Sequence, residues 1–167
     1  IFVIEDGKLQ TKRITGNVVA KKSAVSSLKR GQLYMTRYNQ TSLVSPAGSE
    51  NNYLWASVSP DGSKLLYYVI ELGQAFVSNL DGSDAVSLGV IRAPKWMGNN
   101  WVVGMEDYDD GEKLTASSIV IAAANGANRT VLTDKSVIAT NPSGTSDAST
   151  IVYNTDNGKV FLLKLEK

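Results

Sequence analysis

Short runs of apolar residues alternate with turn-forming residues along most of this chain. The clearest stretch contains four such runs, at residues 54–57, 64–70, 75–80 and 85–88. Short runs rich in Val, Ile, Tyr and Phe between turn signals are typical of β-strands. Pro60 suits the first corner of a type I turn, and Asp81-Gly82 suits a tight hairpin that needs positive φ. The stretch therefore predicts four short strands. Helical periodicity is almost absent, so the whole chain is expected to be all-β.

One segment recurs along the chain with a spacing of about 42 residues. Gly31-Gln32-Leu33-Tyr34-Met35 returns 42 residues later as Gly73-Gln74-Ala75-Phe76-Val77, and 85 residues after that as Gly158-Lys159-Val160-Phe161-Leu162. Self-similarity at a fixed period marks repeat architectures. The period predicts about four strands in every 42 residues.

Three further landmarks give almost the same period. Asp81-Gly82 matches Asn125-Gly126, a step of 44, and Trp55 matches Trp96, a step of 41. Pro60 is matched with Pro142, 82 residues later, with Gly98-Asn99-Asn100 as the intervening copy. We expect the recurring tryptophans to pack between neighbouring repeats.

Radial repetition of four-stranded sheets produces a β-propeller. Four periods of 42 nearly fill the 167 residues, so we predict a single domain over residues 1–167 with about four four-stranded blades. The approximate repeats are residues 12–45, 54–88, 93–133 and 137–165, and residues 1–4 form a strand that closes the ring. Two alternatives stay open: a partial propeller from a larger ring of six to eight blades, and a local hairpin around Asp6-Gly7.

The residues 55–65, WASVSPDGSKL, followed by FVSNLDGS at 76–83, resemble the WD40-like repeat of TolB-type propellers. The same repeat occurs in the propellers of prolyl-oligopeptidase-like and dipeptidyl-peptidase-like enzymes. The resemblance covers residues 54–165 and implies a propeller. TolB-type rings usually have six or more blades, so the count of four blades departs from what the resemblance implies. Function stays open, because one fold supports many functions.

Composition removes several classes of chemistry. The chain has neither cysteine nor histidine, which excludes disulfides, thiol nucleophiles, zinc sites built on Cys or His, and triads with an imidazole base. The net charge of +1 does not favour nucleic-acid binding, although residues 1–50 carry eight Lys/Arg against three Asp/Glu. No run approaches the roughly 18 apolar residues of a membrane-spanning helix.

The densest acidic segment is residues 106–112, EDYDDGE. Alternating carboxylates before a glycine suggest a calcium loop with Asp107, Asp109 and Glu112 as ligands. The spacing misses the EF-hand pattern, because Gly111 occupies a ligand position. A solvated hairpin is the favoured interpretation, and no cofactor other than calcium is expected.

Two short segments imitate catalytic motifs. Residues 144–148 resemble a nucleophile elbow, and residues 26–29 resemble a Ser-x-x-Lys motif, but both lack the companion residues of those sites. We expect them to be ordinary turn and strand residues. Glycoside hydrolysis by two carboxylates stays open, since it needs only a pair about 5 to 9.5 Å apart.

The favoured function is a non-catalytic propeller module that binds a protein or peptide, as the resemblance to TolB-type envelope proteins implies. Its binding face is expected at residues 46–53, 89–95 and 106–113, with Arg92, Tyr108 and Asp109 as contacts. The alternative is an enzyme or part of one: the accessory propeller of a serine peptidase, or a carboxylate-dependent hydrolase. An open ring would also permit a homodimer.

The sequence begins at Ile1 without an initiator Met, so a processed product is expected. The absence of cysteine fits either the cytoplasm or a bacterial envelope compartment. The resemblance favours the bacterial periplasm or cell envelope, with the cytoplasm as the alternative.

Overall fold

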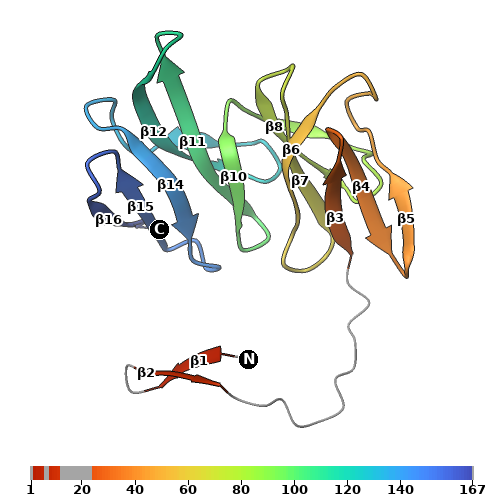
Figure 1. Ribbon diagram of the computed structural model, residues 1–167, viewed down its shortest axis with the longest axis horizontal. Coiled ribbons are helices and arrows are strands. Elements are labelled where there is room, and N and C mark those ends of the chain that lie inside the picture. Colours follow the sequence, from red (N-terminus) through yellow and green to blue (C-terminus); the bar gives the residue numbers. More distant parts are fainter. Residues whose placement is uncertain (1, 6–7, 12–23, 167) are drawn as a thin grey trace.

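The computed structural model describes residues 2–5, 8–11 and 24–166, and every regular element in them is a β-strand (Figure 1). The all-β prediction is confirmed. Among the described residues, no helix is long and apolar enough to cross a membrane. Residues 12–23, at the start of the first predicted repeat, lie outside the described residues.

Four antiparallel sheets follow one another along the chain, and within each sheet the spatial order of the strands is their sequence order. The first sheet contains β3 (Val25–Lys29), β4 (Gln32–Arg37) and β5 (Gln40–Leu43). The second contains β6 (Tyr53–Val58), β7 (Lys64–Val69), β8 (Gln74–Asn79) and β9 (Val86–Gly89). The third contains β10 (Arg92–Met97), β11 (Trp101–Asp109), β12 (Leu114–Ala123) and β13 (Arg129–Val131). The fourth contains β14 (Ala139–Gly144), β15 (Thr150–Thr155) and β16 (Val160–Lys164).

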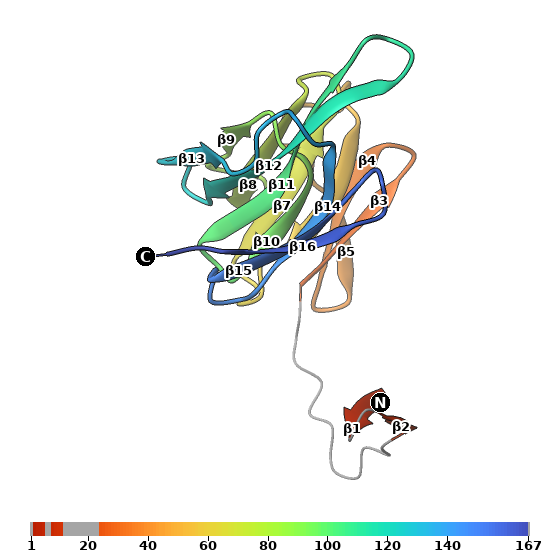
Figure 2. The same ribbon diagram turned by 90° about the vertical axis from the view of Figure 1, so that its left-hand side faces the viewer.

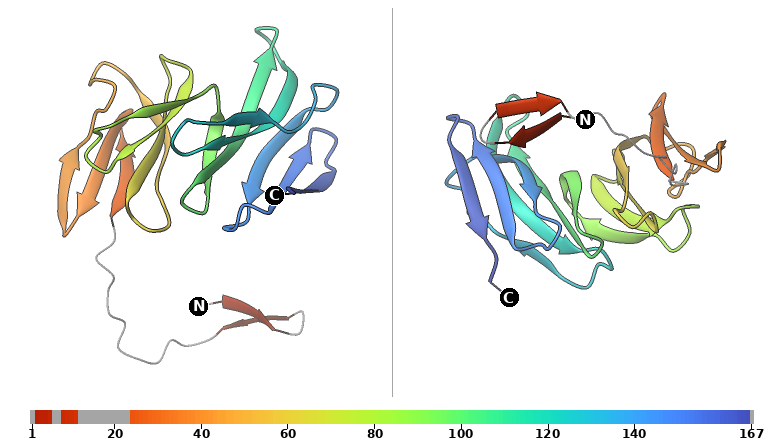
Figure 3. Two further views of the ribbon diagram at one scale, coloured as in Figure 1. Left: turned by 180° about the vertical axis from the view of Figure 1, so that it is seen from behind. Right: turned by 90° about the horizontal axis from the view of Figure 1, so that it is seen from below.

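The four strands predicted from the clearest stretch of sequence correspond to β6–β9. Residues 26–29, which imitate a Ser-x-x-Lys motif, lie in β3. Seen from below, the sheets form a curved row (Figure 3, right). Each sheet packs on the next, and among the described residues no strand of the first sheet packs closely on the fourth. The four sheets therefore form an open arc, as in the partial-propeller alternative.

The hydrophobic core is divided among the three spaces between successive sheets. Leu33 and Met35 of the first sheet pack with Tyr67 of the second. Leu66 and Val77, on the opposite face of the second sheet, pack with residues of the third. A further cluster lies between the third and fourth sheets and includes the buried Ile151. Alternate residues of one strand thus enter two different cores, because successive side chains point to opposite faces.

A break in register recurs in the first strand of three sheets. It lies between Leu54 and Ser57 in β6, between Arg92 and Lys95 in β10, and between Thr140 and Ser143 in β14. Each break holds a non-glycine residue with positive φ: Trp55 at 49°, Ala93 at 46° and Asn141 at 52°. A β-bulge bends its strand and increases the local twist.

The shared bulge corrects two of the landmark matches. Trp55 corresponds to Ala93, so the match of Trp55 with Trp96 was wrong by three residues. Trp96 does pack against the core between the second and third sheets, and its Nε1 donates a hydrogen bond to the Ser57 carbonyl at 3.3 Å. Trp55 is 38% exposed and meets Tyr68 of its own sheet edge-to-face at 5.1 Å.

The match of Pro60 with Pro142 was also wrong, because Pro142 lies in a bulge and Pro60 lies in a turn. The counterpart of the turn at 59–63 is 145–149. In the first turn, the Asp61 carboxylate accepts hydrogen bonds from Ser59 Oγ at 2.6 Å and Ser63 N at 3.0 Å. In the second, the Asp147 carboxylate accepts from Thr145 Oγ1 at 2.5 Å and Ser149 N at 3.1 Å. The segment that imitates a nucleophile elbow is therefore a turn.

The N-terminal strands β1 (Phe2–Glu5) and β2 (Lys8–Thr11) pair with each other in an antiparallel hairpin. This pairing agrees with the local-hairpin alternative around positions 6 and 7. In the structure β1 is not paired with β16, so the closing strand expected at residues 1–4 is not observed in place. The limits of the four repeats stay a prediction.

Candidate functional site

The sheets have two ends, and the three loops of the predicted binding face lie at the same one. Tyr53 is paired with Val69, and Val69 with Gln74, so the connections before β6 and after β7 meet at this end. Asp109 is paired with Leu114 across the β11–β12 hairpin, and Arg92 with Met105. We call residues 44–52, 90–91 and 110–113 the loop end. The β11–β12 hairpin projects beyond the other hairpins there (Figure 2).

Hydrogen bonds hold the longest of these loops, residues 44–52. Gln32 Nε2 donates to the carbonyls of Ser49 at 3.1 Å and Asn51 at 3.0 Å. The buried Tyr53 donates its hydroxyl proton to the Gly48 carbonyl at 2.9 Å and accepts from Ala47 N at 3.0 Å. The loop is therefore held in one conformation by side chains of the first and second sheets.

Glu106 is the centre of a charged cluster beside the loop end. Its carboxylate accepts hydrogen bonds from the Tyr108 hydroxyl and from Arg129, which also donates to the Val90 carbonyl at 3.0 Å. The Lys135 ammonium lies 3.5 Å from the centroid of the Tyr108 ring. Burial alone would raise the pKa of Glu106, but these hydrogen bonds and the positive charges of Arg129 and Lys135 lower it below its usual value. Glu106 is thus an ionised, paired carboxylate.

Asp107 faces a different set of partners. Its carboxylate lies 3.5 Å from Arg92 and 2.6 Å from the hydroxyl of Ser117. The Arg92 side chain is 46% exposed, whereas that of Asp107 is 10% exposed. Ser117 also lies 2.7 Å from the Ala139 carbonyl, at the start of the fourth sheet. Arg92 therefore presents a solvent-accessible guanidinium whose position is set by a nearly buried carboxylate.

The acidic hairpin uses its remaining carboxylates to hold its own turn. Asp109 accepts a hydrogen bond from Gly111 N at 3.0 Å, and Asp110 accepts from Lys113 N at 2.9 Å and Glu112 N at 3.0 Å. These backbone donors lower the pKa of Asp110. Within the described residues, no group of three acidic side chains could hold a metal ion.

The structure therefore does not gather the calcium candidates Asp107, Asp109 and Glu112 around one point. Of the predicted partner contacts, Arg92 and Asp109 are accessible at the loop end. Tyr108 is already engaged by Glu106 and Lys135. Sequence reasoning missed Arg129 and Lys135, which come from the segment after β12 and reach β11 only in the folded sheet.

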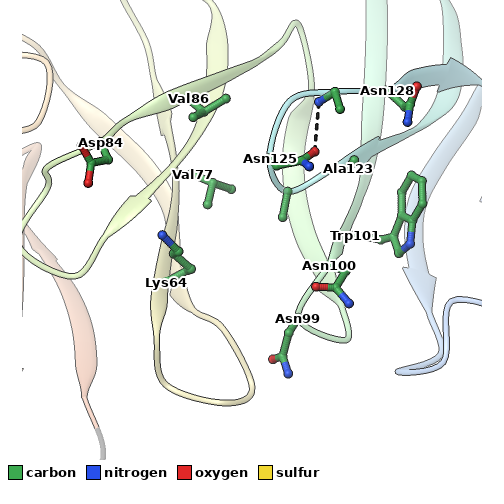
Figure 4. Close-up of a pocket in the computed structure, with 12 residues that line it drawn as sticks. Lys64, Val77, Asp84, Val86, Asn99, Asn100, Trp101, Ala123, Asn125 and Asn128 are labelled. Atoms are coloured by element: carbon green, nitrogen blue, oxygen red, sulfur yellow. Dashed lines mark hydrogen bonds between the residues drawn. The ribbon is translucent and has the colours of Figure 1, made fainter.

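A pocket of about 580 Å³ lies at the opposite end, between the second and third sheets (Figure 4). Four asparagines line it, together with the partly buried Trp101 and with Lys64, whose Nζ donates to Asn79 Oδ1 at 2.8 Å. The asparagines are Asn99, Asn100, Asn125 and Asn128. The side chains of Asn100 and Asn128 have no hydrogen-bond partner in the described part of the chain.

The sequence offered no signal for this pocket, because its asparagines belong to turns of neighbouring sheets. Asn99 and Asn100 lie in the β10–β11 turn, and Asn125 in the β12–β13 turn, where its Oδ1 accepts from Ala127 N at 3.0 Å. Such residues are explained fully by turn preference when the sequence is considered alone.

No family model and no curated protein matches this chain. Solved structures do match it. A putative TolB from Agrobacterium tumefaciens has a TM-score of 0.63 at 14% identity, over 85% of this chain and 54% of that one. TolB from Acinetobacter baumannii has a TM-score of 0.60 at 13% identity, over 81% and 35%. The tricorn protease has a TM-score of 0.60 at 12% identity, over 79% and 14%.

The four described sheets have a β-propeller fold. The resemblance to TolB-type propellers noted from residues 54–165 is thus confirmed at the level of structure. The chain spans about half or less of the length of these similar chains. At these identities the likeness concerns the propeller fold alone.

Proposed function

We propose that this chain is a non-catalytic β-propeller module that binds a protein or peptide at its loop end. The observation that carries the proposal is that three loops lie at one end of the sheets and that hydrogen bonds and ion pairs fix both the longest loop and the charged side chains of the third sheet there. Loop 44–52 is held by Gln32 and Tyr53, and Arg92 is held by Asp107. A surface that is ordered before binding loses less conformational entropy when a partner docks.

The charges favour a partner of mixed polarity. Arg92 and Lys135 offer guanidinium and ammonium groups, and Asp109 offers a carboxylate on the projecting hairpin. Arginine is frequent at the centres of interfaces, where it forms paired hydrogen bonds with carboxylates. A peptide with an acidic residue near a basic one would suit this arrangement.

Selection from a displayed peptide library tests the proposal. Peptides enriched on the wild-type chain are expected to bind Arg92→Glu at least about tenfold more weakly, which corresponds to roughly 1.4 kcal/mol. Asn128→Ala, in the pocket at the opposite end, is the matched control and should bind like wild type. Both variants must retain the wild-type melting temperature. Weaker binding to Asn128→Ala than to wild type, together with unchanged binding to Arg92→Glu, would contradict binding at the loop end.

A second candidate is the accessory propeller of a peptidase, which the likeness to the tricorn protease supports. Such a propeller would bind extended peptides without cleaving them. Mass spectrometry of oligosaccharides after long incubation with the chain separates these functions from a carboxylate-dependent glycoside hydrolase, which would release shorter sugars. Glu106 is a poor general acid for such a hydrolase, because its pKa is lowered and its carboxylate is paired.

For location, we propose the bacterial periplasm or cell envelope, in line with the TolB-type likeness. Fractionation of cells that express the native gene tests this. Recovery of the protein with cytoplasmic markers would contradict it.

A further inference from the structure

The asparagine-lined pocket of about 580 Å³ has a smaller counterpart of about 290 Å³ between the first and second sheets. The two pockets occupy equivalent places in the repeat. Gly82 N donates to the Asn79 carbonyl at 3.0 Å, and Gly126 N donates to the Ala123 carbonyl at 2.9 Å, so the two turns correspond. The three residues before Gly82 line the smaller pocket, and the three before Gly126 line the larger one.

The larger pocket is open because small side chains stand where the smaller pocket has large ones. Leu80 is 8% exposed and packs in the core between the first and second sheets. Its counterpart Ala124 lacks the isopropyl group of a leucine and is only partly buried against the next core. Asn79 corresponds in the same way to Ala123. The space that Leu80 and Asn79 fill in one interface is therefore accessible in the other.

Two contacts between the second and third sheets fix the larger pocket on either side (Figure 4). On one side, the Asp61 amide donates to Asn99 Oδ1 at 3.0 Å. On the other side, the β12–β13 turn lies against β9, since a Cβ atom at Gly126 would lie 2.6 Å from Val86 Cγ1. Glycine permits this approach and the φ of 74°. The pocket has its shape before a ligand binds, which lowers the cost of binding.

The polar groups of the larger pocket are mostly carboxamides that the protein itself leaves free. Asn100 and Asn128 make no side-chain hydrogen bond within the described residues. Asn125 accepts from Ala127 N at 3.0 Å through its Oδ1, and its Nδ2 donates to none of the described residues. A carboxamide offers both donors and an acceptor, and so does each hydroxyl group of a sugar.

The charged groups at the pocket balance each other, and its floor is apolar. Lys64 Nζ donates to Asn79 Oδ1 at 2.8 Å, and Asn79 Nδ2 donates to Asp84 Oδ2 at 2.7 Å. Val77 is 4% exposed and Ala123 is 8% exposed. The lining residues thus offer no unpaired counter-ion to a charged ligand. They suit a neutral ligand with many hydroxyl groups and an apolar ring face.

We propose that the larger pocket binds a neutral saccharide of one or two rings. Asn100, Asn125 and Asn128 bond to its hydroxyl groups, and its ring carbons lie against Val77 and Ala123. The volume of about 580 Å³ is within the range of roughly 300–1,000 Å³ of small-ligand sites. The site lies at the end of the sheets opposite to the loop end, so the inference does not depend on the proposed peptide binding.

NMR titration of the ¹⁵N-labelled chain tests the inference. The probes are glucose, galactose, maltose and cellobiose, with glucuronate and glucosamine as charged counterparts. At least one neutral saccharide should shift the side-chain amide signals of Asn100 and Asn128 and reach saturation at millimolar concentration. Ala124→Leu, which introduces the leucine of the equivalent position, should weaken binding at least about tenfold, because the leucine occupies the space of the ligand.

A second variant keeps the test independent of that core substitution. Asn128→Ala removes an exposed carboxamide and should weaken saccharide binding by about threefold or more, as expected for a lost hydrogen bond. Arg92→Glu, at the loop end, is the control and should bind the saccharide like wild type. All three variants must keep the wild-type melting temperature.

Three outcomes would overturn the inference. The first is the absence of a saturable shift with every neutral saccharide. The second is unchanged affinity in both Ala124→Leu and Asn128→Ala, which would place the sugar elsewhere. The third is tighter binding of glucuronate or glucosamine than of the neutral sugars, which would assign the pocket to a charged ligand. None of these outcomes changes the expected loss of peptide binding in Arg92→Glu, so the two proposals fail separately.

Discussion

The second and fourth sheets have the same local structure and very different burial. Leu66 in β7 and Val152 in β15 occupy equivalent positions, since Leu66 is opposite Ser57 and Val152 is opposite Ser143 beyond matching bulges. Leu66 is fully buried, and Val152 is 41% exposed. The difference arises because, among the described residues, the second sheet has a neighbour on both faces and the fourth has a neighbour on one. In this fold, burial depends on the place of a sheet in the arc and not on the strand pattern.

The sharpest test of this comparison truncates the two equivalent residues. Leu66→Ala should lower the free energy of unfolding by about 2–5 kcal/mol, because it leaves a cavity in the core. Val152→Ala should change it by no more than about 0.5 kcal/mol, as is usual at exposed positions. Urea denaturation of both variants measures the effects. A large loss in Val152→Ala would mean that something covers the outer face of the fourth sheet.

Tyr67 stacks on Phe76 in the second sheet, and Tyr153 stacks on Phe161 in the fourth. These two tyrosines provide a second contrast, which depends on pH. Burial raises the pKa of Tyr67 to about 12, above its value in the unfolded chain. The folded state therefore favours the neutral phenol, and this contribution is complete below about pH 10 and is lost as the pH rises toward 12. Tyr67→Phe should unfold less steeply across this range than wild type. Fluorescence-detected unfolding at pH 9 to 12 measures the difference, with Tyr153→Phe as the control from the fourth sheet.

The two equivalent turns allow a smaller test. Hydrogen bonds from Thr145 and Ser149 lower the pKa of Asp147 to about 2, and those from Ser59 and Ser63 also lower the pKa of Asp61. Because the folded pKa is below the unfolded one, each contribution is present above about pH 4 and is lost as the pH falls. Thr145→Val should move the pKa of Asp147 back toward 3.8, as measured by NMR titration. An unchanged pKa would contradict the role of the hydroxyl.

The smallest effect is expected from calcium. Asp109 and Asp110 accept backbone hydrogen bonds within their own turn. The melting temperature should therefore not change with millimolar calcium or with a chelator. A rise of several degrees with calcium would restore the calcium loop considered for Asp107, Asp109 and Glu112.

The sequence predicted the strands and their period because both depend on local signals. Gly31, Gly73 and Gly158 mark β4, β8 and β16 correctly, since a tight turn before each strand requires positive φ. The turn expected at 144–148 is present, but its correspondence with 59–63 was missed, because the residue types of the two turns differ although their hydrogen bonds are the same. Ala148 there adopts a φ of 55° where the other turn has Gly62.

The candidate site was predictable only in part. Loops 46–53, 89–95 and 106–113 lie at one end of the sheets. Successive antiparallel strands run in opposite directions, so the order of the strands is sufficient to predict this shared location. The pairing of Arg129 and Tyr108 with Glu106 was not predictable, because it depends on the twist and packing of three strands. The asparagine-lined pocket was not predictable for the same reason: its walls come from two different sheets.

The bulges at Trp55, Ala93 and Asn141 also bear on how this fold could be redesigned. A non-glycine residue with positive φ costs about 1 kcal/mol or more, and glycine does not pay that cost. The chain carries this conformation once in the first strand of each of three successive sheets, the second, third and fourth. Each sheet thus has its own bend built in at the same place, and a blade moved to another position in an engineered array would bring its curvature with it.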